Sequence, residues 1–292
     1  MLPTTWARLP FKTCLSPNQR LFVLFISGMG RNRKAPQGAF LLAKYLMFRI
    51  DRSEKNPNLI SIFTGEVCNL ACTLCAPDAS TRWQYELKQY SIQRNQPIVD
   101  TSTVDFTGAS LITFGGGEPV LNKSTMPLLK KINSDTRVMM HFNGTILPSQ
   151  QLLDECARFD SIQFTFSLDD TEERFEYLRW PAKWDKVVAN MFWMRDNCPD
   201  NVEFAVNTVI SVLNQSTYDS VEQWIKNNIP TNKAGKLTAC NTNESNGLLN
   251  RFKRQKYKGM SEIEFLDKLD ARRKTNWRNT FPTAVKILES TV

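Results

Sequence analysis

Short β-rich runs recur along this chain, and helical patterns fill the intervals between them. The β-rich runs cover residues 59–64, 111–114, 137–142, 161–166, 202–210 and 236–239. The helical patterns cover residues 79–90, 122–133, 148–158, 183–197 and 217–228. Strands that alternate with helices favour βαβ units and a parallel sheet. We therefore expect an α/β fold, either an open six-stranded barrel or a flat doubly wound sheet, which periodicity does not distinguish.

The composition fits a chain with a sizeable core. Hydrophobic residues make up 41% of the 292 residues. The mean hydropathy is −0.36, and no apolar run approaches the roughly 18 residues that a spanning helix needs. We therefore expect no membrane among the partners of this protein.

The first 57 residues are the hardest part to interpret. Arg8, Lys12 and Arg20 precede an apolar stretch at residues 21–29, which is reminiscent of a signal peptide. No small-residue cleavage site follows it. We expect a cytoplasmic protein in which residues 1–57 form an N-terminal extension.

The seven cysteines are unevenly distributed. Three fall within eight residues, and the others are scattered singly: Cys14, Cys156, Cys198 and Cys240. An odd count in a chain of this length is not a disulfide framework. The pattern is typical of a reducing compartment with one metal site.

The clustered cysteines, Cys68, Cys72 and Cys75, have the spacing C-x3-C-x2-C and follow the first β-rich run on a loop before a helix. Sites in parallel α/β folds form at the carboxyl ends of strands, and thiolates suit zinc or iron–sulfur clusters. A structural zinc site needs four ligands, but no second cysteine pair is present and the single histidine is His141. Three thiolates would leave one iron of a [4Fe–4S] cluster open. A chance group of buried cysteines is the plain alternative.

This motif resembles the signature of the radical S-adenosylmethionine (SAM) enzymes. The resemblance implies a partial (β/α)6 barrel, a [4Fe–4S] cluster ligated by the three cysteines, and SAM bound at the open iron. It further implies reductive cleavage of SAM to a 5′-deoxyadenosyl radical that abstracts hydrogen from a substrate, with an electron donor such as a flavodoxin or ferredoxin. One departure is Leu74, because many members carry an aromatic residue there.

A second motif, Phe114-Gly-Gly-Gly-Glu-Pro119, ends the second β-rich run. Glycines let a backbone approach a ligand closely, and a proline biases the preceding residue away from helix. Alone, such a segment is usually a turn. It resembles the GGE motif of the same family, which implies that Gly116, Gly117 and Glu118 recognise the SAM amino group.

Further positions match the family less strictly. Asn143 ends the third β-rich run, and Ser167 and Asp169 end the fourth, where the family places ribose contacts. Arg179 resembles a partner of the SAM carboxylate, and Asn207 lies in the fifth run at a common cofactor position. For each of them, an ordinary strand-end cap or salt bridge is the alternative.

Two segments make the resemblance more specific, because they are similar to one subgroup of the radical SAM proteins. Residues 173–184 and 269–282 are similar to those of twitch-domain-containing radical SAM proteins, which phages often encode. Those relatives commonly carry further cysteines for an auxiliary cluster. The four scattered cysteines show no such spacing, and buried cysteines that act as small hydrophobic residues are the simpler interpretation.

The pattern changes after the core barrel, which we place at residues 58–240. A polar, loop-like stretch at 241–250 opens a C-terminal extension, residues 241–292, with expected helices from Ser261 and over 282–289. Ten Lys or Arg and four Asp or Glu lie between residues 251 and 278. This basic segment could attract nucleic acid, and a solvated helical face is the alternative.

The sequence does not identify the substrate. A peptide or protein is one option, and a small nucleotide-like, deazapurine-type substrate is the runner-up. A zinc-stabilised nucleic-acid-binding module and a degenerate, non-catalytic barrel are hypotheses from other classes. The missing fourth zinc ligand opposes the former, and the intact cysteine and GGE motifs oppose the latter.

Overall fold

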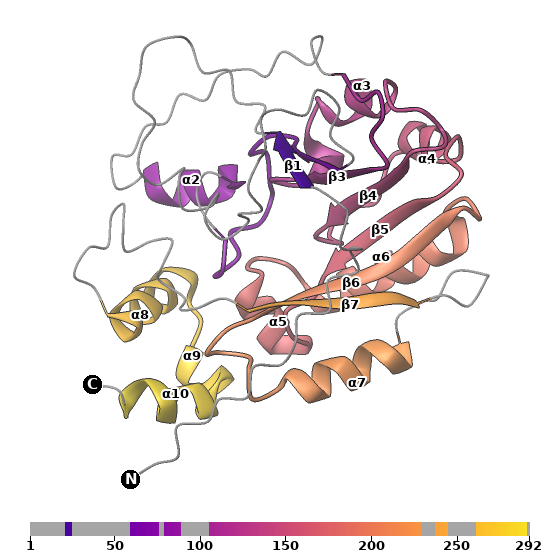
Figure 1. The fold of residues 1–292 in the computed structure, drawn as a ribbon. Helices are drawn as coiled ribbons and strands as arrows, with labels where there is room; N and C mark the ends of the chain where they lie inside the picture. Colours follow the sequence, from indigo (N-terminus) through magenta and orange to yellow (C-terminus); the bar gives the residue numbers. More distant parts are fainter. Residues whose placement is uncertain are drawn as a thin grey trace.

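The computed structural model describes residues 21–24, 59–75, 79–88, 105–228, 237–244 and 261–290. They contain a seven-stranded sheet in which every strand is parallel to its neighbours (Figure 1). The strands are β1 (Leu21–Leu24), β2 (Leu59–Phe63), β3 (Leu111–Gly115), β4 (Arg137–Phe142), β5 (Ile162–Ser167), β6 (Val202–Ile210) and β7 (Leu237–Glu244). The helices are α2 (Thr81–Lys88), η2 (Pro119–Leu121), α3 (Thr125–Leu129), α4 (Gln150–Cys156), α5 (Glu172–Leu178), α6 (Trp184–Asn197), α7 (Tyr218–Asn228), α8 (Glu262–Arg273), α9 (Trp277–Thr280) and α10 (Pro282–Glu289).

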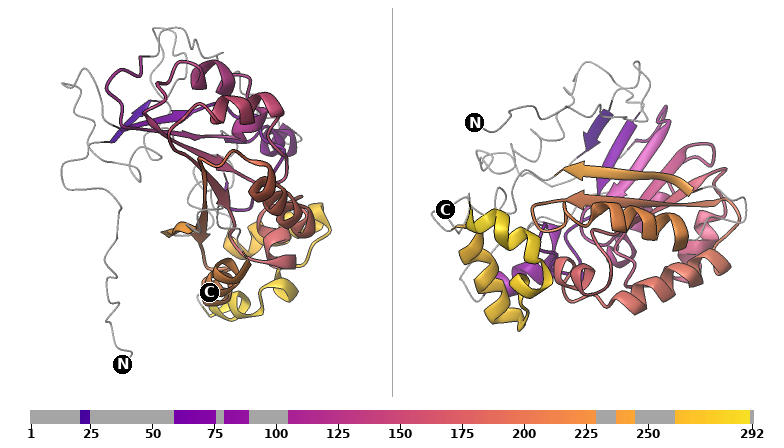
Figure 2. Two further views of the ribbon diagram at one scale, coloured as in Figure 1. Left: turned by 90° about the vertical axis from the view of Figure 1, so that its right-hand side faces the viewer. Right: turned by 90° about the horizontal axis from the view of Figure 1, so that it is seen from below.

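The strand order decides between the two expected architectures. A doubly wound sheet reverses its strand order at a switch point. Here the order follows the sequence from β1 to β7, which is the progression of a barrel wall. Helices α3, α4, α6 and α7 lie on one side of this sheet (Figure 2). The α/β fold and the partial barrel are therefore confirmed, and the six predicted strands correspond to β2–β7.

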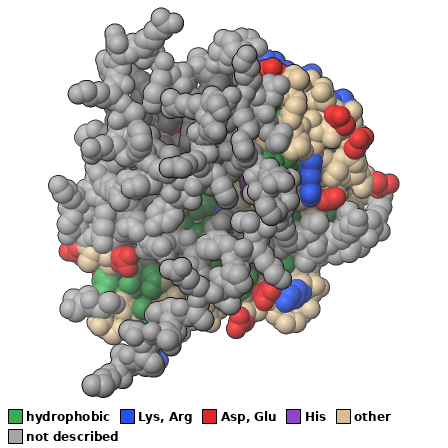
Figure 3. Space-filling view, viewed as in Figure 1, with side chains coloured by type: hydrophobic (Ala, Val, Ile, Leu, Met, Phe, Trp, Pro, Cys, Tyr) green, Lys and Arg blue, Asp and Glu red, His purple; other side chains and the backbone are tan. Residues whose placement is uncertain are grey.

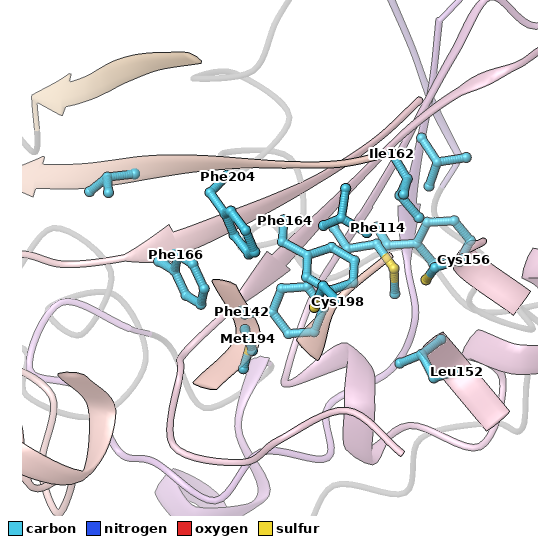
Figure 4. Close-up of a cluster of buried hydrophobic side chains, with 14 of the residues drawn as sticks. Phe114, Phe142, Leu152, Cys156, Ile162, Phe164, Phe166, Met194, Cys198 and Phe204 are labelled. Atoms are coloured by element: carbon cyan, nitrogen blue, oxygen red, sulfur yellow. The ribbon is translucent and has the colours of Figure 1, made fainter. Parts of the chain in front are cut away.

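The main core lies between the sheet and these helices. On β4 and β5, alternate residues point toward the helices, and the rings of Phe142 and Phe164 are 4.6 Å apart between centroids (Figure 4). Phe166 stacks on Phe204 of β6 at 5.7 Å. Cys156 and Cys198 are buried in the same core, as expected of small hydrophobic residues; Cys14 and the side chain of Cys240 lie outside what the structure describes.

Three elements differ from the sequence-based expectation. The apolar stretch from Leu21 begins strand β1, which pairs with β2; the rest of residues 1–57 lies outside the described residues. Helix α5 was not expected; its first turn carries Glu172 and Glu173, which favour a helix start. Strand β7 continues to Glu244, so its pairing with β6 extends the sheet into the polar stretch that the sequence predicts as loop.

The C-terminal helices form a second core with the loop that carries the clustered cysteines. Helix α8 begins with a capping box between Ser261 and Glu264, which confirms the expected helix start. Buried residues of α8, α9 and α10 pack against Trp83 of α2 and Tyr177 of α5. Both Figure 1 and Figure 2 place α8–α10 beside α2.

The described part of the C-terminal extension is nearly balanced in charge. Residues 261–290 contain six Lys or Arg and five Asp or Glu. Arg273 is buried, and Arg278 pairs with Asp267 and Glu289. In the space-filling view, interspersed basic and acidic side chains lie on the right-hand part of the described surface, away from α8–α10 (Figure 3). Three of the six basic residues at 261–290, Arg272, Arg273 and Arg278, are in ion pairs, which leaves little net positive charge on this part of the extension. No helix in the described ranges is long and apolar enough to cross a membrane.

Candidate active site

The loop between β2 and α2 carries the three clustered cysteines, and it is fastened to the start of α2. The Thr81 hydroxyl accepts a hydrogen bond from the Cys68 amide at 3.1 Å and donates to the Cys68 carbonyl at 3.0 Å. The Trp83 indole Nε1 donates to the Cys72 carbonyl at 2.8 Å. A turn joins the Cys75 amide to the Cys72 carbonyl at 3.0 Å. The loop therefore has a defined path before any cofactor binds.

The three thiols lie close enough to affect one another's ionisation. Burial raises the pKa of Cys68 to about 11, and a charge on Cys75 raises it further. Burial also raises the pKa of Cys72, while the Arg179 guanidinium lowers it. Arg179 is thus a cation that favours the thiolate form at Cys72.

The thiols do not converge as they would around one small ion. Within the described ranges, no group of three His, Cys, Asp or Glu side chains is gathered to hold a single metal ion. Zinc places its sulfur ligands at about 2.3 Å, so they crowd one point. Each cysteine of a [4Fe–4S] cluster binds a different iron, so its sulfurs stand further apart. Three thiols without a fourth ligand beside them in the described part of the chain do not complete a structural zinc site, whereas they match the number needed for a cluster with one open iron.

The glycines at the end of β3 lie against the segment that leads to Cys68. The Gly117 amide donates to the Gly65 carbonyl at 2.7 Å, and the Glu118 amide donates to the Val67 carbonyl at 2.8 Å. Gly116 has a φ of +111°, and a Cβ there would lie 2.8 Å from the Gly65 carbonyl oxygen. A Cβ at Gly117 would overlap the Val67 carbonyl. Only glycine allows this close approach, which fixes Glu118 beside the cysteine loop.

Glu118 has one engaged and one free carboxylate oxygen. Its side chain is 1% exposed, and Oε2 accepts a hydrogen bond from the Asn143 amide at 2.7 Å. Oε1 is buried without a hydrogen-bond partner in the described structure. Burial raises the pKa of Glu118 to about 7, although the Asn143 amide opposes that shift. An unpaired buried carboxylate oxygen is costly, so this atom is suited to a cationic ligand.

Asn143 connects the GGE glutamate to the cysteine loop. Its side-chain Nδ2 donates to Asn69 Oδ1 at 2.9 Å and lies 3.9 Å from Cys68 Sγ. Asn69 in turn donates to the Thr145 hydroxyl at 2.8 Å. The sequence did not single out Asn69, and Thr145 enters only as the end of the polar turn Asn143-Gly-Thr145, which resembles a turn common in the family. Their polar side chains, within the cysteine motif and directly after the third strand, are the only signal that could have indicated them.

Asp169 and Arg179 form a buried ion pair with 3.0 Å between Oδ2 and Nη2. Asp169 Oδ1 also accepts from the Val209 amide at 3.0 Å. Asp169 thus makes the salt bridge that the sequence analysis gave as the alternative to a cofactor contact. Arg179 is only partly satisfied, because its buried Nε has no hydrogen-bond partner in the described structure. Burial alone would lower the pKa of Arg179, but Asp169 and Cys72 raise it.

Ser167 and Asn207 lie side by side on neighbouring strands. They are register partners of β5 and β6, and the Leu168 amide donates to the Asn207 carbonyl at 3.1 Å. Both residues are partly exposed. Because neighbouring core residues such as Phe166 and Val206 point toward the helices, Ser167 and Asn207 point to the opposite face of the sheet.

Comparison with known proteins identifies the class of enzyme. The model of the radical SAM superfamily matches residues 62–227, and the chain belongs to this superfamily. It is a radical SAM enzyme, whose superfamily uses a [4Fe–4S] cluster and S-adenosylmethionine. This membership decides against the zinc-stabilised binding module.

Individual relatives match only part of the chain. It is 28% identical over 174 residues to molybdenum cofactor biosynthesis protein 1 of Dictyostelium discoideum, covering 57% of this chain and 26% of that protein. It is 26% identical over 148 residues to GTP 3′,8-cyclase of Syntrophomonas wolfei subsp. wolfei, covering 49% of this chain and 44% of that protein. The chain thus spans less than half the length of these two curated relatives.

Solved structures of Streptococcus suis SuiB also match. SuiB bound to S-adenosylmethionine has a TM-score of 0.41 and 14% identity, covering 82% of this chain and 60% of that one. SuiB bound to the precursor peptide SuiA has a TM-score of 0.44 and 15% identity, covering 84% and 54%. Both TM-scores are below 0.5. The assignment of the fold therefore depends on the strand order of this chain and not on its likeness to SuiB.

Proposed function

We propose that Cys68, Cys72 and Cys75 each ligate one iron of a [4Fe–4S] cluster and that SAM binds beside them. The proposed SAM-binding residues are those at the strand ends: Gly116, Gly117, Glu118, Asn143, Ser167, Asp169, Arg179 and Asn207. One observation carries the proposal. Two buried atoms of opposite charge, Glu118 Oε1 and Arg179 Nε, have no partner in the described structure, and both groups act electrostatically on the cysteine thiols. SAM carries the matching ammonium and carboxylate groups.

When bound, the cluster and SAM supply an electron and a 5′-deoxyadenosyl radical for hydrogen abstraction from a substrate. The residues of this chain bind SAM and orient it. Glu118 accepts from an ammonium group through its free oxygen, and Arg179 offers its guanidinium to a carboxylate. Ser167 and Asn207 present hydroxyl and amide groups that can hydrogen-bond a ribose. Asp169 orients Arg179 through the ion pair at 3.0 Å.

The cluster assignment is tested by iron content. Cys75→Ala should lose the visible absorption of the cluster after anaerobic reconstitution, because each ligand carries its own iron. Cys198→Ala, at a buried thiol in the main core, is the matched control and should retain about four irons per chain. Full iron content and absorbance in Cys75→Ala would contradict the ligand set.

For the substrate, we propose a peptide or protein. Support comes from the C-terminal extension, which resembles that of twitch-domain proteins and packs beside the cysteine loop through the second core. We divide the chain into an N-terminal extension at 1–57, the barrel at 58–240 and the extension at 241–292, with β7 crossing the last boundary. A cytoplasmic location and a flavodoxin or ferredoxin donor remain predictions.

A nucleotide-like substrate is the second candidate, and the relative named GTP 3′,8-cyclase favours it. The two classes are separated by incubating the reconstituted enzyme with SAM, reductant and either a peptide pool or nucleoside triphosphates. Formation of 5′-deoxyadenosine above the substrate-free level, together with a mass change in one pool, identifies the class. A mass change confined to the nucleotides would overturn the peptide proposal.

A further inference from the structure

Arg273, the last residue of α8, reaches from the C-terminal extension into the cysteine loop. Its side chain is 2% exposed, and Nη2 donates to the Ala71 carbonyl at 2.9 Å. Ala71 directly precedes Cys72. The same nitrogen lies 3.3 Å from Glu86 Oε2 of α2, a carboxylate that is itself 5% exposed.

Two tryptophans place their indole rings beside this guanidinium, and each of these residues also hydrogen-bonds the loop, Trp83 through its ring and Trp180 through its main chain. Arg273 Cζ lies 4.7 Å from the Trp83 ring centroid and 4.9 Å from that of Trp180, within the range of a cation–π contact. Trp83 donates to the Cys72 carbonyl at 2.8 Å, and the Trp180 carbonyl accepts from the Ala71 amide at 2.8 Å. The arginine is therefore at the centre of the contacts that fix the main chain of residues 71–72.

Burial of this arginine is incompletely compensated. Its Nε and Nη1 are buried without hydrogen-bond partners in the described structure, as is Glu86 Oε1. A buried ion pair of this kind gives little net stability compared with apolar packing. Burial lowers the pKa of Arg273, and the Glu86 carboxylate opposes that shift. The contacts themselves place the guanidinium beside Cys72, because it bonds the carbonyl of the preceding residue and lies over the Trp83 ring that bonds the Cys72 carbonyl.

We propose that Arg273 is a positioning residue for the iron-binding loop, which fixes the main chain before Cys72 and places a buried positive charge beside that ligand. The inference rests on the ligand set proposed above. It makes the C-terminal extension part of the cluster site. Because a positive charge stabilises the more negative, reduced form of a cluster, Arg273 also favours reduction.

The test compares Arg273→Gln and Arg273→Lys with Arg278→Ala. Arg278 is the matched control, since it also lies over a tryptophan, Trp277, and pairs with carboxylates, but this ring contact and these ion pairs all lie within the extension itself. The first readout is amide hydrogen exchange of Ala71 and Thr73 in the apoprotein, which requires no cluster. The second is the midpoint potential of the reconstituted cluster, followed by electron paramagnetic resonance.

We expect exchange at both amides to be about 10- to 150-fold faster in Arg273→Gln, because a hydrogen bond from a charged donor is lost. Arg273→Gln should also weaken cluster reduction about tenfold, which is about 59 mV for one electron. Arg273→Lys should loosen the loop but keep a near-parental potential, because it keeps the charge. Arg278→Ala should change neither readout.

A double variant, Glu86→Gln with Arg273→Met, covers the case in which the single variants do not fold, because it removes both buried charges and keeps the side-chain volume. Faster exchange confined to residues 71–75 in this variant supports the proposal. Parental exchange and parental potential in the folded variants overturn it. Equal acceleration throughout the protein also overturns it, because that reports general stability. Loss of iron in the parent protein would instead contradict the ligand set.

Discussion

Glu118→Gln isolates the negative charge that we assign to the SAM ammonium group. Gln has nearly the shape of Glu, and its amide oxygen can still accept from the Asn143 amide, which now bonds Oε2 at 2.7 Å. The amide nitrogen would then replace Oε1, the buried atom without a partner. A donor would face the ammonium where an acceptor stood before.

The expected loss follows from the strength of a charged hydrogen bond. Removing one is worth about 1.5–3 kcal/mol, so the dissociation constant of SAM should rise about 10- to 150-fold. The Glu118→Gln substitution should not destabilise the folded protein. Burial disfavours the charged carboxylate and raises the pKa of Glu118 to about 7, so a neutral side chain should not lower the free energy of unfolding.

The assay is titration of SAM into the anaerobically reconstituted variant, with iron content measured on the same sample. Glu203→Gln is the matched control, because Glu203 pairs with Arg137 at 3.3 Å near the amino end of β6, away from the cysteine loop. We expect SAM affinity close to wild type in the control. A Glu118→Gln variant with full iron and a dissociation constant within about twofold of wild type would refute the placement of SAM.

Two further predictions concern the fold around the site. Gly117→Ala should lower the free energy of unfolding by about 1–3 kcal/mol, because its Cβ would overlap the Val67 carbonyl, whereas Gly115→Ala meets no atom within 4 Å and should lose less than about 0.5 kcal/mol; chemical denaturation compares them. His141 has its pKa lowered to about 4 by burial, below its ordinary value of about 6.5, so the unfolded chain binds a proton first as the pH falls between these values. The free energy of unfolding should therefore decrease by about 2 kcal/mol from pH 6.5 to 4. This is less than the full pKa shift implies, because His141 is partly exposed. His141→Gln should remove this pH dependence from the denaturation profile. Equal slopes in the two proteins would show that His141 stays protonated alike in both states.

The strands were predictable where their two faces differ clearly. The bounds of β4 and β6 match the predicted runs, and on β4 the buried residues Val138 and Met140 alternate with less buried ones. Strand β1 was missed because four apolar residues in a longer apolar stretch show no period. Its pairing with β2, a tertiary contact, makes it a strand.

The site was predictable at the level of motifs but not of contacts. The cysteine spacing and the GGE segment are local patterns, and the structure brings them together through Asn143. The pairing of Asp169 with Arg179 follows from the return of the chain after β5 through α5, a helix that the sequence reading did not include. Arg273 is separated from Ala71 by 202 residues, so no local pattern links it to the cysteines.

That separation bears on how the protein is made. The wall of the cysteine loop includes α8, α9 and α10, which leave the ribosome long after the cysteines and after the barrel strands between them. Domains generally fold from the N-terminus during synthesis, but this loop lacks its Ala71 partner until Arg273 has been translated. If iron were delivered to the nascent chain, the cysteine loop would still lack its contacts with Arg273 and α8–α10. Maturation should therefore be post-translational, and a chain that stalls before α8 should accumulate as a barrel whose cysteine loop is not yet fixed in place.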